Sequence, residues 1–244
     1  MIKIIQIGKT VQNRPIFMRR VGTSKPNLLI IASVHAREHI TTDLMNAIVD
    51  AYDGGGSFDY VPMLNADGVL KAKYGGDTLW KANANGVDLN VNFDADWGMG
   101  KSNTRTAGSE NYIGEYPHSE PEAKAIVNLL KMNDYSLVVC YHSKGEEIYY
   151  GFADNFGHVE EASGFAAFLG YELKTSAGSA GGIKDFYCKN YKGLGLTVEV
   201  GEDRFDHPYP VSELPNLIKK HTGTIELLIE AGDRIARKIH GGGD

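Results

Sequence analysis

An apolar run that ends just before two metal-capable side chains is the feature that most constrains how this chain can fold. Residues 28–32 read LLIIA, a composition typical of a buried β-strand. Residues 39–52 follow with apolar side chains at helical spacing, so we expect a helix there. His35 and Glu38 therefore lie where a strand gives way to a helix, and in α/β proteins this is where ligands usually bind.

Two further apolar runs end in a similar way. Residues 136–139 lead into His142, and residues 194–200 form an apolar strand that contains a single acid, Glu199. Alone, His142 would more often be a hydrogen-bonded core histidine, and Glu199 could be half of an internal ion pair. A charged side chain is seldom buried in an apolar strand without a partner. The positions of His142 and Glu199 in the two strands therefore favour functional roles.

Together these residues match the composition of a catalytic zinc site. Such a site has three protein ligands and keeps one position open for water or substrate. A further carboxylate nearby can act as the base. The sequence predicts one zinc ion per chain, with His35, Glu38 and His142 as ligands and Glu199 as the catalytic base.

The chain resembles the zinc carboxypeptidases of the carboxypeptidase A/B type, because landmarks of that family occur here in the same order. They are HxxE at 35–38, GVDLNVNF at 86–93, HS at 142–143, GGIKDF at 181–186 and TVE at 197–199. The resemblance covers nearly the whole chain. It implies an α/β fold, with a twisted mixed sheet flanked by helices in one domain at 1–240 and a short tail at 241–244. It also implies a metallopeptidase acting on a peptide substrate.

The chain departs from the family members that trim terminal residues at two positions. Their Asn-Arg-Asn motif reads Asn90-Val91-Asn92 here, and valine cannot replace an arginine that grips a terminal carboxylate. The mobile tyrosine of the family is also missing, since by count Ala177 falls at its place. We therefore do not expect efficient trimming of ordinary C-terminal residues.

Lys184 lies about where the family places the residue at the floor of its specificity pocket. A cation there favours a substrate that carries a side-chain carboxylate. The chain also resembles bacterial enzymes that cut the γ-D-glutamyl–diaminopimelate bond of cell-wall peptides, through WKAN at 80–83, KDF at 184–186 and TVEVG at 197–201. The alternative is that Lys184 simply pairs with Asp185. As members of the matched motifs, Asn90 and Ser143 are the other expected substrate-binding residues.

The carbonyl-polarising arginine of the family has no direct counterpart. Alignment on Trp80 assigns the position to Lys81, whereas alignment on Gly86 assigns it to Asn85. Lys81 could stabilise an oxyanion as a point charge. We therefore take Lys81 as the catalytic cation.

Other interpretations of the same residues stay open. His35, Glu38 and His39 also fit HxxEH, the inverted zincin pattern in which both histidines bind metal. That pattern gives His142 and Glu199 no role. The chain could also be an ordinary metallocarboxypeptidase, a related deacylase of N-acyl amino acids, or a zinc-binding module without catalysis. Retention of Glu199 disfavours the binding module, which needs no base.

Composition argues against several classes of protein. A net charge of −6 with acids and bases interspersed disfavours a nucleic-acid-binding surface. No apolar run approaches the ~20 residues of a membrane span, and the first residues read as a strand rather than a signal peptide. We expect a cytoplasmic protein with no nucleic-acid or membrane partner. Secretion after removal of a leader stays open, and the oligomeric state is not predicted. Cys140 and Cys188 are expected to be free, Cys140 as a buried thiol.

The remaining elements follow from periodicity and turn residues. We expect further strands at 2–7, 15–20, 58–63 and 147–150, and helices at 119–132, 158–169 and 211–238. Residues 119–122 read SEPE, a capping box with proline in the first turn. The aperiodic stretch 64–118 is expected to be a long loop that forms the substrate-side wall. The surface histidines should be His118, His158, His207, His221 and His240.

Overall fold

Alternation along the central strands places two hydrophobic cores on opposite faces of one sheet. In β3 (Leu28–Ile31), Leu28 and Ile30 belong to one core and Leu29 and Ile31 to the other. Successive side chains of a strand point to opposite faces, so a strand covered on both faces reads as an unbroken apolar run. The computed structural model describes residues 1–175 and 178–241 and confirms this strand.

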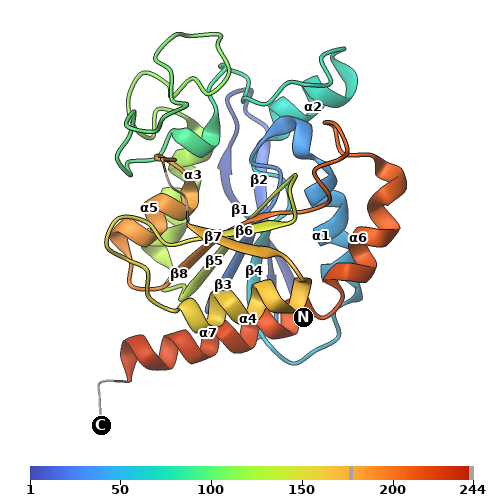
Figure 1. The fold of residues 1–244 in the computed structure, drawn as a ribbon, viewed down its shortest axis with the longest axis vertical. Helices are drawn as coiled ribbons and strands as arrows, with labels where there is room; N and C mark the ends of the chain where they lie inside the picture. The colour runs from blue at the N-terminus through green and yellow to red at the C-terminus, as the bar shows by residue number, and fades with distance from the viewer. Residues whose placement is uncertain (176–177, 242–244) are drawn as a thin grey trace.

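Among the described residues, eight strands form one twisted mixed sheet in the order β1-β2-β4-β3-β5-β8-β6-β7 (Figure 1). Its centre, β4-β3-β5-β8, is parallel, whereas β2 joins β4 and β6 joins β8 in antiparallel fashion. The other strands are β1 (Ile2–Lys9), β2 (Pro15–Val21), β4 (Phe58–Val61), β5 (Leu137–His142), β6 (Glu147–Tyr150), β7 (Glu172–Thr175) and β8 (Leu194–Glu199).

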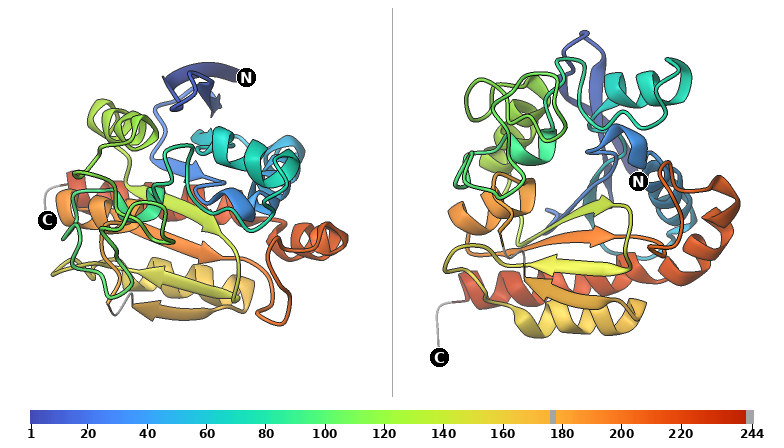
Figure 2. Two further views of the ribbon diagram at one scale, coloured as in Figure 1. Left: turned by 90° about the horizontal axis from the view of Figure 1, so that it is seen from above. Right: turned by 45° about the horizontal axis from the view of Figure 1, so that its top comes forward.

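Helices cover both faces of the sheet. One core contains residues of α1 (Ile40–Ala51), α4 (Val159–Leu169), α6 (Leu214–His221) and α7 (Thr224–His240). The other contains residues of α3 (Pro121–Met132) and α5 (Ile183–Asn190). Figure 2 shows α4 and α7 lying together against one face, with α3 and α5 on the other side. The predicted fold class, a mixed sheet flanked by helices in one domain, is confirmed. Of the predicted tail, residues 242–244 lie outside the described residues.

The predicted C-terminal helix, residues 211–238, is wrong as a single element. A short 3-10 turn, η3 (Val211–Glu213), leads into α6. The helical structure is then interrupted before α7 begins at Thr224. Gly223 lies at the break with φ +87°, a left-handed conformation that most side chains disfavour. The glycine was visible in the sequence as a helix stop.

The prediction of a featureless loop over residues 64–118 is also wrong in part. The segment contains α2 (Ala66–Tyr74), whose cap Asn65 accepts a hydrogen bond from the Gly68 N–H, and a 3-10 turn, η2 (Leu89–Val91). The sequence pattern hid α2 because the helix is short and carries an interior glycine. β7 and α5 were not predicted either. β7 is a four-residue edge strand that is largely polar.

The predicted capping box at residues 119–122 is wrong in detail. The N-cap of α3 is Glu120, which makes no side-chain capping bond, while Pro121 does open the helix. Ser119 instead donates from its Oγ to Glu120 Oε1 and accepts from Asn92 Nδ2. These bonds tie the start of α3 to the segment just after η2.

His221 is buried, which corrects its assignment to the surface. Its Nε2 lies 3.1 Å from the Tyr171 hydroxyl, and Thr224 Oγ1 donates to its carbonyl. The residue therefore joins the end of α6 to the core rather than facing water. Cys140 and Cys188 are buried free thiols, as predicted for Cys140.

No helix within the described residues has both the length and the apolar character needed to cross a bilayer.

Burial of His221 should make stability fall in mildly acidic solution. Burial lowers the pKa of His221 to about 3 from an ordinary value of 6.5. Below pH 6.5, His221 therefore binds a proton in the unfolded chain but not in the folded chain. Stability is lost as the pH falls towards 3. At about 1.4 kcal/mol per pKa unit, this residue should cost about 2.5 kcal/mol between pH 7 and pH 4.5. Urea unfolding of metal-free protein at both values of pH measures the loss.

The matched variants are His221→Gln and His240→Gln, the second at an exposed histidine. His221→Gln should lose less stability on acidification than the unchanged protein, and His240→Gln should lose as much. Equal acid losses in all three proteins would contradict the prediction.

Candidate active site

The carboxyl ends of three neighbouring strands bring the predicted zinc ligands and base together. β3, β5 and β8 lie side by side and run parallel, so all three end at the same edge of the sheet. His142 ends β5, Glu199 ends β8, and the two residues are register partners. His35 follows β3 and precedes a 3-10 turn, η1 (Ala36–Glu38). The strand order therefore creates the cluster.

Three buried side chains converge there in a geometry that can hold one metal ion. His35 Nδ1 lies 2.8 Å from Glu38 Oε1 and 3.2 Å from His142 Nδ1. His142 Nδ1 lies 2.9 Å from Glu38 Oε2. One ligand atom from each residue lies within 4.8 Å of the other two. Two imidazole nitrogens and a carboxylate are donors that suit zinc, so the residues present fit the predicted ion.

The charges around the cluster favour a cation at its centre. Burial alone would lower the pKa of His35, but the carboxylates of Glu38 and Asp88 outweigh burial and raise that pKa to about 9. Burial would likewise raise the pKa of Glu38, yet His35 and His142 hold it well below its ordinary range. A metal ion between these groups would supply the positive charge that otherwise comes from a proton.

Asp88 holds His35 from its outer side. Its Oδ1 lies 3.1 Å from His35 Nε2 and its Oδ2 lies 2.8 Å from Lys81 Nζ. Burial would raise the pKa of Asp88, but Lys81 and His35 lower it far below its ordinary value. A carboxylate on the outer nitrogen fixes the tautomer and orientation of a ligand histidine and raises its basicity. Asp88 thus holds His35 with its Nδ1 turned towards Glu38 and His142.

His39 is not part of the cluster, so the structure disfavours the inverted zincin interpretation. His39 is the N-cap residue of α1 and does not join the metal-capable group among the described residues. Ser143 does not line the cavity described below, but its backbone N–H donates to Glu38 Oε2 at 3.3 Å. Ser143 thereby helps to orient Glu38, and its expected contact with substrate stays a prediction.

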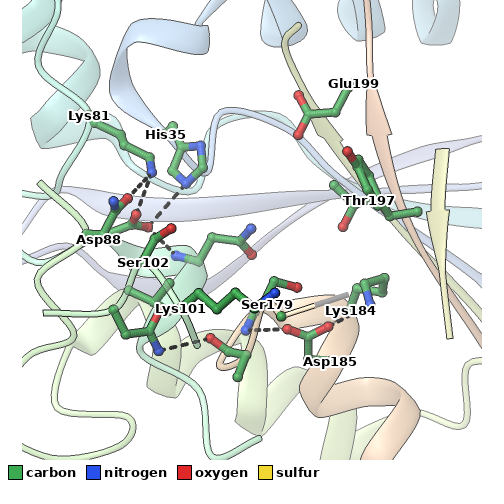
Figure 3. Close-up of a pocket in the computed structure, with 18 residues that line it drawn as sticks. His35, Lys81, Asp88, Lys101, Ser102, Ser179, Lys184, Asp185, Thr197 and Glu199 are labelled. Carbon is green, nitrogen blue, oxygen red and sulfur yellow. Dashed lines mark hydrogen bonds and ion pairs between the residues drawn. The ribbon is translucent and has the colours of Figure 1, made fainter. Parts of the chain in front are cut away.

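A cavity of about 430 Å³ opens beside the cluster (Figure 3). His35 and Glu199 line it together with Lys81, Asn90 and Lys184. Eight of the lining residues, among them Lys81 and Asn90, come from the stretch 64–118, so this stretch forms a wall of the cavity, as predicted. The cavity thus contains the predicted base, cation and substrate-binding side chains, except Ser143.

Glu199 is held in a setting that disfavours its charge. Desolvation by burial, followed by the nearby Glu38 carboxylate, raises the pKa of Glu199 to about 8. A raised pKa marks a carboxylate that readily accepts and releases a proton near neutral pH. A cation held by Glu38 and the histidines would offset part of this shift, because it would screen Glu38.

Lys184 lines the cavity but already has acceptors. Its Nζ lies 2.6 Å from Asp185 Oδ1 and donates to the Gly151 carbonyl at 2.6 Å. Asp185 Oδ2 in turn accepts from the Gly182 N–H at the start of α5. The pairing with Asp185 that the sequence left open therefore exists. An ammonium carries three N–H donors, so one remains for a ligand.

The two candidates for the carbonyl-polarising position occupy different places. Lys81 lines the cavity, whereas Asn85 is not among its lining residues and donates to Glu120 Oε2 at 2.8 Å. The structure therefore favours alignment on Trp80. Lys81 also donates to Asn111 Oδ1 at 2.6 Å, so its ammonium is held between two acceptors.

Asn90 and Val91 occupy one wall of the cavity. Asn90 Oδ1 accepts from the Ile183 N–H at 3.2 Å, and its own N–H donates to Asp88 Oδ1 at 2.8 Å. With its oxygen fixed, the amide nitrogen of Asn90 can serve a ligand. Val91 offers no charge, as the sequence implied. The comparison with the family tyrosine at Ala177 lies outside the described residues.

No role was assigned to Asp88 or Thr197 from the sequence, and neither Tyr149 nor Tyr150 was singled out. Asp88 and Thr197 lie within the matched motifs GVDLNVNF and TVE, so motif membership carried a signal that was not used. Tyr149 lines the cavity, and Tyr150 packs against the core on the other side of β6. The alternation of the strand explains this difference.

The family of zinc carboxypeptidases matches residues 1–222 of the chain. This chain belongs to the zinc carboxypeptidase family. Zinc is the cofactor of that family, in agreement with the donors gathered at His35, Glu38 and His142. The resemblance seen in the sequence motifs is confirmed.

The relatives include an endopeptidase and a carboxypeptidase by name. A γ-D-glutamyl-L-diamino acid endopeptidase of Lysinibacillus sphaericus is 31% identical over 89% of this chain, which spans 64% of that protein's length. Human mast cell carboxypeptidase A is 26% identical over 59% of this chain and 40% of its own. The motif resemblance to diamino-acid-specific enzymes agrees with the first of these.

Two solved structures share the fold. Bovine thrombin-activatable fibrinolysis inhibitor, in complex with a tick carboxypeptidase inhibitor, superposes with a TM-score of 0.78 at 23% identity, covering 98% of this chain and 91% of its own. The murein-tripeptide amidase MpaA of Escherichia coli O157 gives 0.67 at 22% identity, covering 95% and 91%. At this identity the likeness establishes the fold alone.

The cluster predicts which histidine a metal assay should detect. Protein purified without added metal should contain about one zinc per chain by elemental analysis, because three ligands suffice for a catalytic site. His142→Ala should lose most of this zinc. His39→Ala should retain it, since His39 lies outside the cluster. Loss of zinc in His39→Ala with full retention in His142→Ala would restore the inverted pattern.

Proposed function

We propose that this chain is a zinc-dependent metallopeptidase that hydrolyses an amide bond beside an acidic or diaminopimelate residue of a bacterial cell-wall peptide. One observation carries the proposal: the cluster of His35, Glu38 and His142 adjoins the cavity that contains Glu199 and Lys184. Metal donors, a base and a cation for the substrate therefore serve one reacting centre.

His35, Glu38 and His142 are proposed to hold the zinc. When bound, zinc polarises the scissile carbonyl and lowers the pKa of water towards ~7. Glu199 then accepts a proton from the attacking water and passes it to the departing amine. Its position at the end of β8, in register with His142, places the carboxylate beside the cluster. Its raised pKa suits both halves of this transfer.

Lys81 is proposed to stabilise the negative charge that develops on the carbonyl oxygen. It lines the cavity, and its pairs with Asp88 and Asn111 hold the ammonium in one position. Burial would lower the pKa of Lys81, but Asp88 outweighs it and raises that pKa, so the charge is retained. A fixed charge that needs no reorganisation stabilises a transition state most effectively.

The substrate preference follows from Lys184, Asp185 and Val91. The Lys184–Asp185 pair makes a polar wall that an apolar side chain would desolvate without compensation. A side-chain carboxylate can take the free N–H of Lys184. Val91 lacks the charge needed to grip an ordinary C-terminal carboxylate. A diaminopimelate residue therefore suits the cavity better than phenylalanine.

Removal of the base should abolish most of the activity without releasing the metal. Glu199→Gln should keep zinc and fold but lose roughly a hundredfold or more in turnover, the scale of general-base catalysis. Glu202→Gln removes a nearby exposed carboxylate and should leave turnover unchanged. Steady-state hydrolysis by zinc-loaded protein measures both. Near-normal turnover in Glu199→Gln would remove Glu199 from this role.

The substrate is tested with peptides that differ by one group. γ-D-Glutamyl-diaminopimelate and γ-D-glutamyl-lysine differ by the side-chain carboxylate, so the first should be hydrolysed faster, by about tenfold for one partly buried charge pair. Hippuryl-Phe, hippuryl-Arg and an N-acetyl amino acid should be poor substrates. Preference for a hippuryl peptide would favour an ordinary carboxypeptidase. Preference for the N-acetyl amino acid would favour a deacylase.

A further inference from the structure

The lysines that line the cavity differ in whether a carboxylate already neutralises them. Lys81 pairs with Asp88 at 2.8 Å and Lys184 with Asp185 at 2.6 Å. Lys101 also lines the cavity, and among the described residues no carboxylate lies within ion-pair distance of its ammonium. The cavity therefore carries one unneutralised lysine, and it stands at the exposed rim.

The segment that carries Lys101 is tied to residues 178–180, and the stem of the Lys101 side chain lies against Gly178. Its backbone N–H donates to the Gly178 carbonyl at 2.9 Å, and Asn103 Nδ2 donates to the Ala180 carbonyl at 3.3 Å. The apolar stem of Lys101 passes directly over Gly178, since a Cβ added to Gly178 would meet its Cδ and Cε at 2.8 Å. A larger residue at 178 would displace the lysine, so the glycine leaves room for this path.

The rim that carries Lys101 faces the reacting groups. In the close-up, Lys101 lies beside Ser102 and Ser179, across the cavity from Glu199 (Figure 3). The neighbouring wall at Val91 has no charge. A peptide that places its scissile bond near Glu199 would therefore meet one free cation on the opposite side. A carboxylate is the complementary group that such a peptide offers.

We propose that Lys101 binds a carboxylate of the substrate at the rim of the cavity and so determines specificity together with Lys184. The inference rests on the proposed function, because it takes the cavity to hold a peptide. A γ-D-glutamyl-diaminopimelate peptide has two carboxylates that can pair with Lys101. They are the α-carboxylate of the glutamyl residue and the main-chain carboxylate of diaminopimelate. Lys101 binds one of them as a point charge.

Binding measured without turnover tests the inference. Zinc-loaded Glu199→Gln protein is titrated calorimetrically with γ-D-glutamyl-diaminopimelate and with two amidated forms, each blocked at one of the two carboxylates. One amide should bind about tenfold more weakly than the free acid, as expected for a charge pair at a partly exposed site. The weaker amide identifies the carboxylate that Lys101 binds.

Variants at position 101 decide whether the lysine is responsible. Added to Glu199→Gln, Lys101→Met should weaken the free acid about tenfold and remove the difference between acid and amide. Lys101→Arg should preserve the difference. Lys219→Met, which removes an exposed lysine on α6, should bind like the parent. Equal affinity for all three ligands, or an acid preference unchanged in Lys101→Met, would overturn the inference.

Failure of this inference is distinct from failure of the proposed function. Hydrolysis by protein that retains Glu199, with no acid preference in binding, would overturn the role of Lys101 and leave the peptidase in place. An acid preference that Lys101→Met removes, in protein that hydrolyses none of the peptides, would support the carboxylate site and overturn the peptidase.

Discussion

The parallel register of β3, β5 and β8 is the constraint on which the site depends. Because neighbouring parallel strands end at the same edge of a sheet, three segments distant in sequence deliver His35, His142 and Glu199 to one place. The burial that holds these strands in the sheet also removes water from the groups at their ends. That burial gives the charges there their strength, since charges interact more strongly away from water. The burial that stabilises the fold therefore also strengthens the electrostatic interactions in the site.

Charge balance then organises the cavity. Glu38 and Asp88 are buried carboxylates that need positive partners, and His35 stands between them. Lys81 completes the pair with Asp88, and Lys184 completes a second pair with Asp185. After these pairs form, the histidine cluster still lacks a cation and Lys101 still lacks an anion. Zinc supplies the cation, and a carboxylate of the substrate supplies the anion.

The sequence predicted the parts of the site that lie on strongly apolar strands. Runs such as LLIIA identify buried strands, and the polar residue that ends each run is conspicuous. Other features could not be predicted because they depend on tertiary contacts. The pairing of Asp88 with both His35 and Lys81 joins segments that the chain keeps apart. Lys101 lies in an aperiodic stretch, where nothing local shows which charge faces the cavity. β7 is too short and too polar to be recognised as a strand from its sequence.

The central claim is that the strand ends build one zinc site from His35, Glu38 and His142, with Glu199 beside the metal as the base. Anomalous diffraction at the zinc absorption edge, from crystals of the full chain, tests it most directly. One peak is expected, bonded to His35 Nδ1, His142 Nδ1 and the Glu38 carboxylate at about 2.0–2.2 Å, with Glu199 adjacent but not bonded to the ion. A peak bonded to His39, or one that recruits Glu199 as a ligand and leaves no open position, would contradict it.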